Sequence, residues 1–329
     1  MNAPATVQPR FADVLTAAAR IATHAQLTPI ATSRSLDGLS GAQLYFKCEQ
    51  LQRVGAFKFR GACNAVFALD AVTAAHGVVT HSSGNHGAAL ALAAQLRGIA
   101  CHVVVPEGAV RSKLEAIEAS GAVLHRCAAN LSAREAACSK VQAETGATLV
   151  HPYITAEVIA GQGTAALELL TAHPDLDALV VPVGGGGLAA GTAIAMHALA
   201  PDCQLFLAEP AGADDAARSF ARGALDHDVV PDTICDGLRA GMGAINFEIL
   251  RSSNARVLTV DDTQTIAAMR LLWSRGKHLV EPSSATVLAA VLANRALFEG
   301  RKVGLILSGG NVDLDALPKL FELAQANSA

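Results

Sequence analysis

Short apolar runs alternate with long alanine-rich segments along nearly the whole chain. The apolar runs predict strands at 43–47, 77–80, 100–105, 123–127, 178–183, 204–208, 255–260 and 303–307. The alanine-rich segments predict helices at 11–24, 84–97, 111–120, 132–145, 161–173, 187–199, 263–274, 283–294 and 314–325. This alternation is typical of βαβ units, so we expect an α/β fold with mostly parallel sheet buried on both faces.

The same pattern suggests two units. We expect a smaller domain at 71–151, inserted into a larger domain that comprises 1–70 and 152–329. No repeat, low-complexity tract or obvious linker interrupts the chain. Ligands of open α/β sheets bind outside the carboxyl ends of the strands, and three of the loops described below follow predicted strands at that end.

Composition supports a large core and narrows the range of partners. Of 329 residues, 51% are hydrophobic and 16% charged, which argues against disorder. The net charge of −4 comes without a basic block, which argues against a nucleic-acid partner. No apolar run approaches the roughly 20 residues of a membrane span, and the first ten residues suggest a short disordered leader without a secretion signal.

The seven cysteines are odd in number, scattered, and without a C-x-x-C pair. Disulfides and a zinc site are therefore poorly supported, and a cytoplasmic location fits best.

Lys58 is the most informative single residue. It stands between Phe57 and Phe59, with Gly55 and Gly61 close by. Burial against apolar neighbours disfavours the ammonium form, and a neutral amine is a nucleophile toward carbonyl groups. The alternative is a surface lysine whose stem covers apolar area.

A loop of small polar residues, His81-Ser82-Ser83-Gly84-Asn85-His86-Gly87, joins a predicted strand to a predicted helix. Such residues let backbone amides approach a ligand, and the positive end of the helix dipole suits a carboxylate. The alternative is an ordinary N-cap turn.

Four successive glycines, Gly184 to Gly187, form a second loop between a predicted strand and a predicted helix. Backbone amides in such a loop can surround a phosphate. The segment 185–190 also satisfies G-x-G-x-x-A, with Glu209 about 20 residues on, so a nicotinamide-dependent oxidoreductase is an alternative. A nicotinamide-dependent enzyme would leave Lys58 and the loop His81 to Gly87 without a function.

Two further segments carry polar groups at strand ends. Ser308-Gly309-Gly310-Asn311 follows the last predicted strand, and its serine can pair with a ring nitrogen or cap a helix. The turn Glu209 to Asp215 holds carboxylates that suit Mg²⁺ or Ca²⁺, or that are simply solvated.

Taken together, these segments resemble the fold type II pyridoxal-phosphate enzymes, in the serine/threonine dehydratase and serine racemase branch. The resemblance runs from Thr28-Pro29 to Asp313. Its matching elements are Phe57-Lys58-Phe59-Arg60-Gly61, Ser82-Ser83-Gly84-Asn85-His86-Gly87, Ala160-Gly161-Gln162-Gly163-Thr164, Gly184 to Gly187, Glu281-Pro282-Ser283 and Ser308-Gly309-Gly310-Asn311. It implies a tryptophan synthase β-like fold, with the cofactor between a large and a small domain, and a homodimer.

The resemblance also implies residue roles. Lys58 would carry pyridoxal 5'-phosphate through an imine, and the cofactor-binding set would be Phe57, Lys58, Asn85, Gly184, Gly185, Gly186, Gly187, Leu188, Glu281 and Ser308. The glycines and Leu188 would bind the phosphate, Asn85 the ring hydroxyl and Ser308 the ring nitrogen. The substrate-binding set would be Ser82, Ser83, Gly84, Asn85, His86 and Arg134.

Within these sets, Ser83 matches the second base of the racemases, and Arg134 matches an arginine that lies near the substrate side chain in the family. Glu209, the Ala213 carbonyl and Asp215 match a divalent-cation site. Two departures argue against serine as the best substrate. Ala240-Gly241 replaces the usual hydroxyl residues after Arg239, and Tyr153 stands where relatives often have asparagine.

We therefore expect dehydration with deamination of a β-hydroxy-α-amino acid, such as serine, threonine or 3-hydroxyaspartate, to a 2-oxo acid and ammonia. Ser308 is a neutral partner for the ring nitrogen, which makes the ring a weaker electron sink and favours elimination. The alternatives are a serine or aspartate racemase on the same fold, the nicotinamide-dependent oxidoreductase, and a non-catalytic pyridoxal-phosphate carrier.

Overall fold

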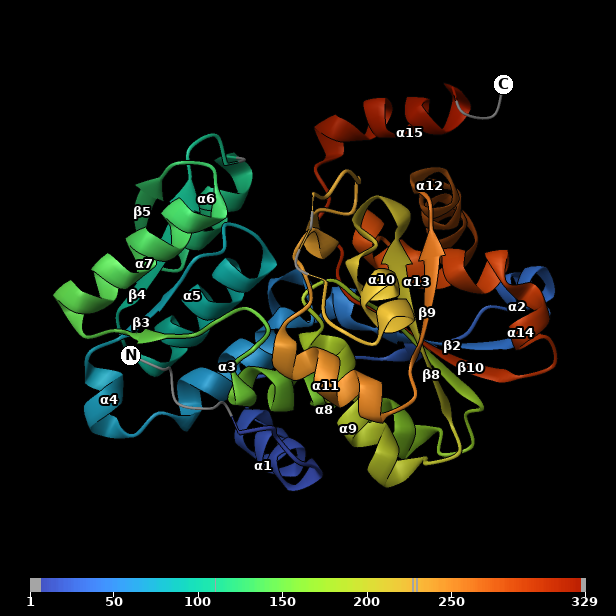
Figure 1. The fold of residues 1–329 in the computed structure, drawn as a ribbon, viewed down its shortest axis with the longest axis horizontal. Coiled ribbons are helices and arrows are strands. Elements are labelled where there is room, and N and C mark those ends of the chain that lie inside the picture. Colours follow the sequence, from blue (N-terminus) through green and yellow to red (C-terminus); the bar gives the residue numbers. More distant parts are fainter. Residues whose placement is uncertain (1–6, 110, 227, 229, 327–329) are drawn as a thin grey trace.

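The computed structural model describes residues 7–109, 111–226, 228 and 230–326, which build two separate sheets with helices packed on them (Figure 1). Of the leader expected at residues 1–10, residues 1–6 lie outside this described part, and the remainder precedes the first helix. No helix among the described residues combines the length and the apolar character needed to cross a lipid bilayer.

Within the described residues, the larger sheet has six strands in the order β1-β2-β10-β7-β8-β9. Their bounds are β1 (Ile30–Ala31), β2 (Gln43–Cys48), β7 (Ala178–Pro182), β8 (Gln204–Pro210), β9 (Arg256–Val260) and β10 (Lys302–Leu307). All neighbours pair in parallel except β1 with β2. The smaller sheet has four described strands, all parallel, in the order β5 (Val123–Cys127), β4 (Cys101–Pro106), β3 (Val78–Thr80) and β6 (Thr148–Leu149).

Helices cover both faces of the larger sheet, because successive residues of a strand point to opposite sides. Leu179 and Val181 of β7 pack with α1 (Phe11–Ile21), α8 (Ala156–Ala172), α9 (Gly187–Leu199), α10 (Asp215–Arg222) and α11 (Ala244–Ser252). Ala178 and Val180 pack on the other side with α2 (Arg34–Ser40), α12 (Asp262–Leu271), α13 (Pro282–Ala293), α14 (Arg295–Phe298) and α15 (Leu317–Ala326).

The smaller sheet is covered in the same way. Val103 and Val105 of β4 face a core that includes α3 (Lys58–Ala68), α5 (Asn85–Arg97) and α6 (Arg111–Ala119). Val104 faces α7 (Leu131–Thr145). The short helix α4 (Ala71–Ala75) follows α3 along the chain. Helix α3 contacts both α5 and α8, so it lies where the elements of the two sheets meet (Figure 1).

The α/β class and the mostly parallel sheets agree with the prediction, and every predicted strand is present with small shifts at its ends. The short strands β1 and β6 were not predicted, and neither were the helices α2, α3, α4, α10, α11 and α14. Helix α3 has buried residues along most of its length, so its sequence lacks the one-sided apolar stripe that marks a surface helix.

Several predicted helix bounds were wrong. The helix expected at 161–173 begins earlier, at Ala156, and the one expected at 263–274 changes after Leu271 into a π turn at Leu272–Gly276. The helix expected at 314–325 opens as a 3-10 turn at Leu314–Ala316. Each error lies at an element end, where hydrophobic periodicity carries the least information.

Candidate active site

Lys58 is the first residue of α3, and it lies against the loop that follows β10. The Phe57 amide donates to the Ser308 carbonyl at 3.0 Å, and Ala56 forms an antiparallel bridge with Gly309. These backbone contacts bring the lysine next to Ser308, although the two residues come from opposite ends of the sequence.

The amine of Lys58 sits in a confined and largely apolar setting. Its Nζ donates to the Pro152 carbonyl at 2.9 Å and lies 5.1 Å from the centroid of the Phe57 ring. Removal from water lowers the pKa of Lys58 to about 8, although the Glu281 carboxylate acts in the opposite direction. A useful share of the amine is therefore neutral near physiological pH, as a nucleophile or base requires. The ring of Phe59 instead packs into the core with α5.

The glycine loop is tightly built. Gly186 has a left-handed φ of 88°, and a Cβ at Gly185 would come within 2.4 Å of the Tyr153 ring. The amides of Gly187 and Leu188 open α9 and donate to no protein acceptor within the described residues. Free amides at the start of a helix are suited to a phosphate, as the sequence predicts.

Ser308 completes this cluster at the carboxyl end of β10. The residue is buried, and its hydroxyl makes no hydrogen bond to another described residue. A neutral hydroxyl can pair with a ring nitrogen without protonating it. The desolvated Lys58 amine, the free amides of the glycine loop and the free Ser308 hydroxyl therefore fit the cofactor that the sequence predicts.

The loop before α5 reaches the same region from the smaller sheet. Asn85 donates from Nδ2 to both Glu281 carboxylate oxygens, at 3.0 and 3.2 Å, so two predicted cofactor-binding residues contact each other. Ser82, Ser83 and Gly84 are half-buried, and no side chain caps α5 at Gly84. The Ser83 hydroxyl is thus not used as a helix cap.

His86 is a neutral imidazole of defined tautomer. Its Nε2 lies 3.0 Å from the Val150 carbonyl, which can only accept, so Nε2 carries the hydrogen and Nδ1 is an acceptor. Nδ1 is buried and has no partner within the described residues. Burial, and next the charge of Lys58, lower the pKa of His86 to about 3.

A cluster of rings beside the glycine loop was not predicted. The His81 and His151 centroids are 5.1 Å apart, and His151 and Tyr153 are 4.6 Å apart. Burial lowers the pKa of His151 to about 3. Asn246 donates to the carbonyls of Tyr153 and Gly185, at 2.9 and 2.6 Å, which ties the cluster to the glycine loop. In the sequence, the segment 151–153 is marked only by Tyr153, which stands where relatives often have asparagine. No local pattern marks Asn246.

Arg134 of α7 lies close to these rings. Its charge is among the influences, after burial, on the pKa of His81 and of Tyr153. Its Nε is buried without a hydrogen-bond partner in the described part of the chain, where Arg134 also forms no ion pair with a carboxylate. Among the described residues, Arg134 is therefore not held by a neighbouring glutamate such as Glu135.

Glu209 does not behave as a ribose-binding acid. Its two carboxylate oxygens accept from the amides of Ala216 and Ala217, at 2.7 and 2.8 Å, at the start of α10. Burial raises the pKa of Glu209 to about 8. This geometry removes the main support for the nicotinamide alternative.

Asp215 lies next to this position. Its Oδ2 accepts from the Met242 amide at 2.8 Å, whereas its Oδ1 is buried without a partner in the part of the chain that the structure describes. Ala213 ends a 3-10 turn that precedes Asp215. No group of three or more His, Cys, Asp or Glu side chains suited to a metal occurs among the described residues. A cation here would therefore depend on the Ala213 carbonyl as well as on the two carboxylates.

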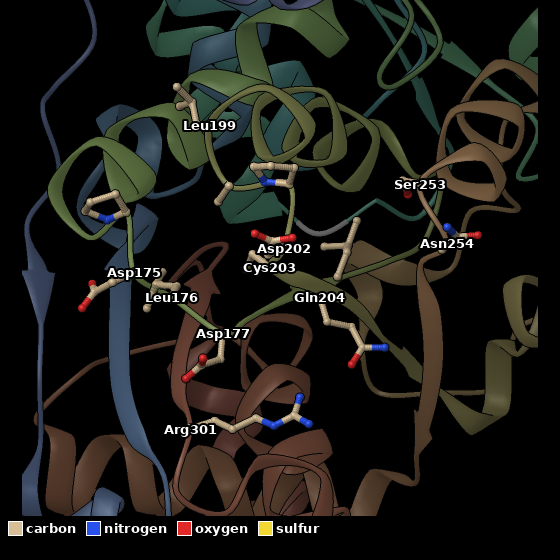
Figure 2. A pocket seen from close by; sticks show the side chains of 14 residues that line it. Asp175, Leu176, Asp177, Leu199, Asp202, Cys203, Gln204, Ser253, Asn254 and Arg301 are labelled. Atoms are coloured by element: carbon tan, nitrogen blue, oxygen red, sulfur yellow. The ribbon is translucent and has the colours of Figure 1, made fainter.

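A cavity of about 850 Å³ lies at the opposite end of the larger sheet, at the amino ends of β7 and β8 (Figure 2). Asp175, Asp177, Asp202 and Arg301 line it, and none of the predicted site residues does. A smaller cavity of about 440 Å³ is lined in part by His151 and so borders the ring cluster.

Comparison with known proteins agrees with this geometry. The family model for pyridoxal-phosphate dependent enzymes matches residues 21–309. A β-hydroxyaspartate dehydratase of Paracoccus denitrificans is 47% identical over 94% of this chain and 98% of its own length. A serine racemase of Dictyostelium discoideum is 46% identical over 94% of this chain and 97% of its own.

Two further relatives extend the comparison. An L-threo-3-hydroxyaspartate ammonia-lyase of Saccharomyces cerevisiae is 43% identical over 94% of this chain and 95% of its own length. The solved structure of maize serine racemase superposes with a TM-score of 0.92 at 43% identity, covering 98% of this chain and all of the other.

Proposed function

This chain belongs to the family of pyridoxal-phosphate dependent enzymes, and we propose that it dehydrates and deaminates a β-hydroxy-α-amino acid. The products are a 2-oxo acid and ammonia. The observation that carries the proposal is the Lys58 amine, whose pKa is lowered to about 8 and whose residue follows Phe57, the partner of Ser308 in a backbone hydrogen bond. When bound, pyridoxal phosphate supplies an aldehyde for the substrate amine and a ring that withdraws electrons from Cα.

Lys58 is the base in this proposal. Its amine takes the proton from Cα, and the electron pair left there forms the Cα=Cβ bond as the bond from Cβ to the hydroxyl oxygen breaks. The departing hydroxide receives that proton and leaves as water, and hydrolysis of the resulting enamine releases the oxo acid and ammonia. The pKa of about 8 allows the amine to accept this proton near neutral pH and to return it afterwards. Hydrogen bonding to the Pro152 carbonyl holds the amine on one side of the site.

The remaining cofactor-binding residues keep their predicted roles as part of the proposal. The amides of Gly187 and Leu188 receive the phosphate, and Ser308 pairs with the ring nitrogen. A neutral partner leaves the ring a weaker electron sink, so charge at Cα is short-lived and loss of the β-hydroxyl is favoured. Phe57 and Glu281 would complete the site for the ring, and Asn85 would bind its hydroxyl.

We propose 3-hydroxyaspartate as the preferred substrate. The loop Ser82 to His86, at the start of α5, receives the α-carboxylate. Arg134 receives the second carboxylate, because its planar fork matches a carboxylate and its Nε has no partner within the described residues. Two relatives of similar length are named for activity on hydroxyaspartate, which supports this choice.

Glu209, the Ala213 carbonyl and Asp215 form the proposed site for Mg²⁺ or Ca²⁺. The unpartnered, buried Oδ1 of Asp215 supports it, because a buried carboxylate oxygen needs a donor or a cation.

We further propose a homodimer in the cytoplasm, with a smaller domain at 71–151 and a larger one formed by 1–70 and 152–329. Seven free cysteines are consistent with a reducing compartment.

Racemisation is the second candidate, because several curated relatives are serine racemases. It requires an acid or base on the face opposite Lys58, and Ser83 is the aligned residue. A serine hydroxyl is a poor acid or base at neutral pH, whereas elimination needs no second base. We therefore expect dehydration to dominate, with minor racemisation.

The test is a panel of serine, threonine and 3-hydroxyaspartate stereoisomers with the holoenzyme, scored for oxo acid, ammonia and, by chiral chromatography, recovered substrate. The proposal expects oxo acid from 3-hydroxyaspartate above all others. Ser83→Ala should remove interconversion of enantiomers and spare elimination from the isomer served by Lys58. Interconversion faster than oxo-acid formation in the wild type would make the protein a racemase.

A further inference from the structure

The chain reaches Lys58 through a strained turn. Val54 has φ 56° and ψ 16°, and Gly55 follows at φ 69°. Left-handed backbone is ordinary for glycine, but for a β-branched residue it is an outlier that persists only where surrounding contacts enforce it. The contacts that hold Val54 in this conformation therefore help to set the position of Lys58.

The enforcing contacts come from the loop after β10. Asn311 donates from Nδ2 to the Val54 carbonyl at 2.7 Å, and the Gly310 amide donates to the Gly55 carbonyl at 2.9 Å. The Asn311 amide also packs on the turn, because a Cβ at Gly55 would lie 2.6 Å from its Oδ1. The turn is thus tied to the loop at both of its residues.

The side-chain amide of Asn311 also holds Asn85. Asn311 Nδ2 donates to Asn85 Oδ1 at 2.9 Å, and the Asn311 backbone amide donates to Glu281 Oε2 at 3.1 Å. A carboxylate only accepts, so the Asn85 nitrogen must face Glu281 and its oxygen must face Asn311. The orientation of the Asn85 amide is therefore fixed by contacts within the chain.

We propose that Asn311 is a positioning residue, whose one amide fixes both the strained turn that delivers Lys58 and the side chain of Asn85. It joins segments from the two sheets at the site, and it acts through Val54 and Asn85 rather than on the reacting atoms. Asn311 is exposed, so its removal takes little from the core and leaves the fold in place. This inference depends on the proposed function only in the test that measures binding of pyridoxal phosphate.

The first test uses the cofactor-free protein and measures amide hydrogen exchange in peptides that cover residues 53–60. Asn311→Ala should speed exchange of the Gly55 and Phe57 amides about tenfold, because the turn opens more often once its anchor is lost. Asp313→Ala is the matched control, since Asp313 is exposed in the same loop and, among the described residues, its side chain accepts only from the Asp315 amide. Unchanged exchange in Asn311→Ala would overturn the proposal.

The second test is rescue. Glycine adopts the left-handed conformation without strain, so Val54→Gly should keep the turn formed without its anchor. Pyridoxal phosphate titrated into Asn311→Ala should bind about 5- to 30-fold more weakly than to the wild type, as expected for lost hydrogen bonds at a binding site. Adding Val54→Gly should restore part of this loss and slow the exchange of residues 53–60.

The outcomes separate the two claims. A double variant that recovers neither affinity nor exchange protection would refute the positioning role of Asn311 at the turn. A wild-type protein that does not bind pyridoxal phosphate would refute the proposed function, while the exchange measurement would still decide the role of Asn311.

Discussion

At the carboxyl ends of β7 and β10 the described chain presents a buried serine, free amides and a desolvated lysine, whereas at the amino ends of β7 and β8 it presents exposed charges around a cavity of about 850 Å³. Asp175 and Asp177 in that cavity are already engaged by Lys302, through its side chain and its backbone amide. This larger cavity is therefore not the place where the predicted catalytic residues lie.

The difference has a physical cause. Parallel strands place all their carboxyl ends on one edge, where the following loops and helix starts converge. At that edge, burial lowers the pKa of Lys58 and shifts the amine toward its neutral form. At the other edge, the hydrogen bond between Lys302 and Asp175 raises the pKa of the lysine and lowers that of the aspartate, so both groups stay charged in contact with water. Substitutions at the two edges should therefore have very different effects.

The largest contrast should come from two lysines. Lys58→Ala should lower kcat/KM by at least roughly 10⁴-fold, since it removes the base and the covalent anchor together, without loss of fold. Lys302→Ala at the other edge is the matched control and should retain turnover. Steady-state kinetics and a thermal melt of both variants decide this, and substantial turnover by Lys58→Ala would refute the account.

Removal of the proposed cation should have the next largest effect. A chelator should lower the Tm by about 5 °C, because a ligand bound only to the folded state stabilises it by mass action. Added Mg²⁺ or Ca²⁺ should reverse the change. Asp215→Asn should be insensitive to chelator, and a wild-type protein equally insensitive would refute the cation site.

Arg134→Ala should separate substrates rather than abolish turnover. Loss of a charge-assisted pair should lower kcat/KM for 3-hydroxyaspartate by about 10- to 100-fold and change that for serine little. Arg111→Ala, an exposed arginine paired with Glu115 in the same part of the chain, is the control. An equal loss for both substrates would assign Arg134 a structural role.

The smallest effect should come from the cavity at the amino ends. Asp202→Asn and Arg301→Ala change exposed charges, which typically alter stability by less than about 0.5 kcal/mol. Their kcat/KM should stay within about twofold of the wild type. A loss comparable to that of Arg134→Ala would mean that this end of the sheet takes part in the reaction.

The features that sequence reasoning found were local. The glycine loop, the loop before α5 and the Ser308 loop are contiguous motifs that follow strands, so a single stretch of sequence carries each signal. The α/β class followed from alternation alone, and the family was predicted from the order of these motifs.

The features that could not be predicted from the sequence depend on contacts between distant segments. The Pro152 carbonyl that holds the Lys58 amine, and Asn246 that ties Tyr153 to Gly185, have no local pattern to mark them. Helix α3 was missed because burial on most sides erases its amphipathic period. The strain at Val54 is likewise invisible until the backbone is seen, because valine is an unexpected residue for left-handed φ.

The central claim is that the desolvated Lys58 carries the cofactor, and covalent fixation tests it most directly. The protein is incubated with pyridoxal phosphate, reduced with borohydride, digested and mapped by mass spectrometry. The account predicts a phosphopyridoxyl group on Lys58 in the wild type and its absence from that position in Lys58→Ala. A modification found mainly on another lysine, or none at all, would contradict it.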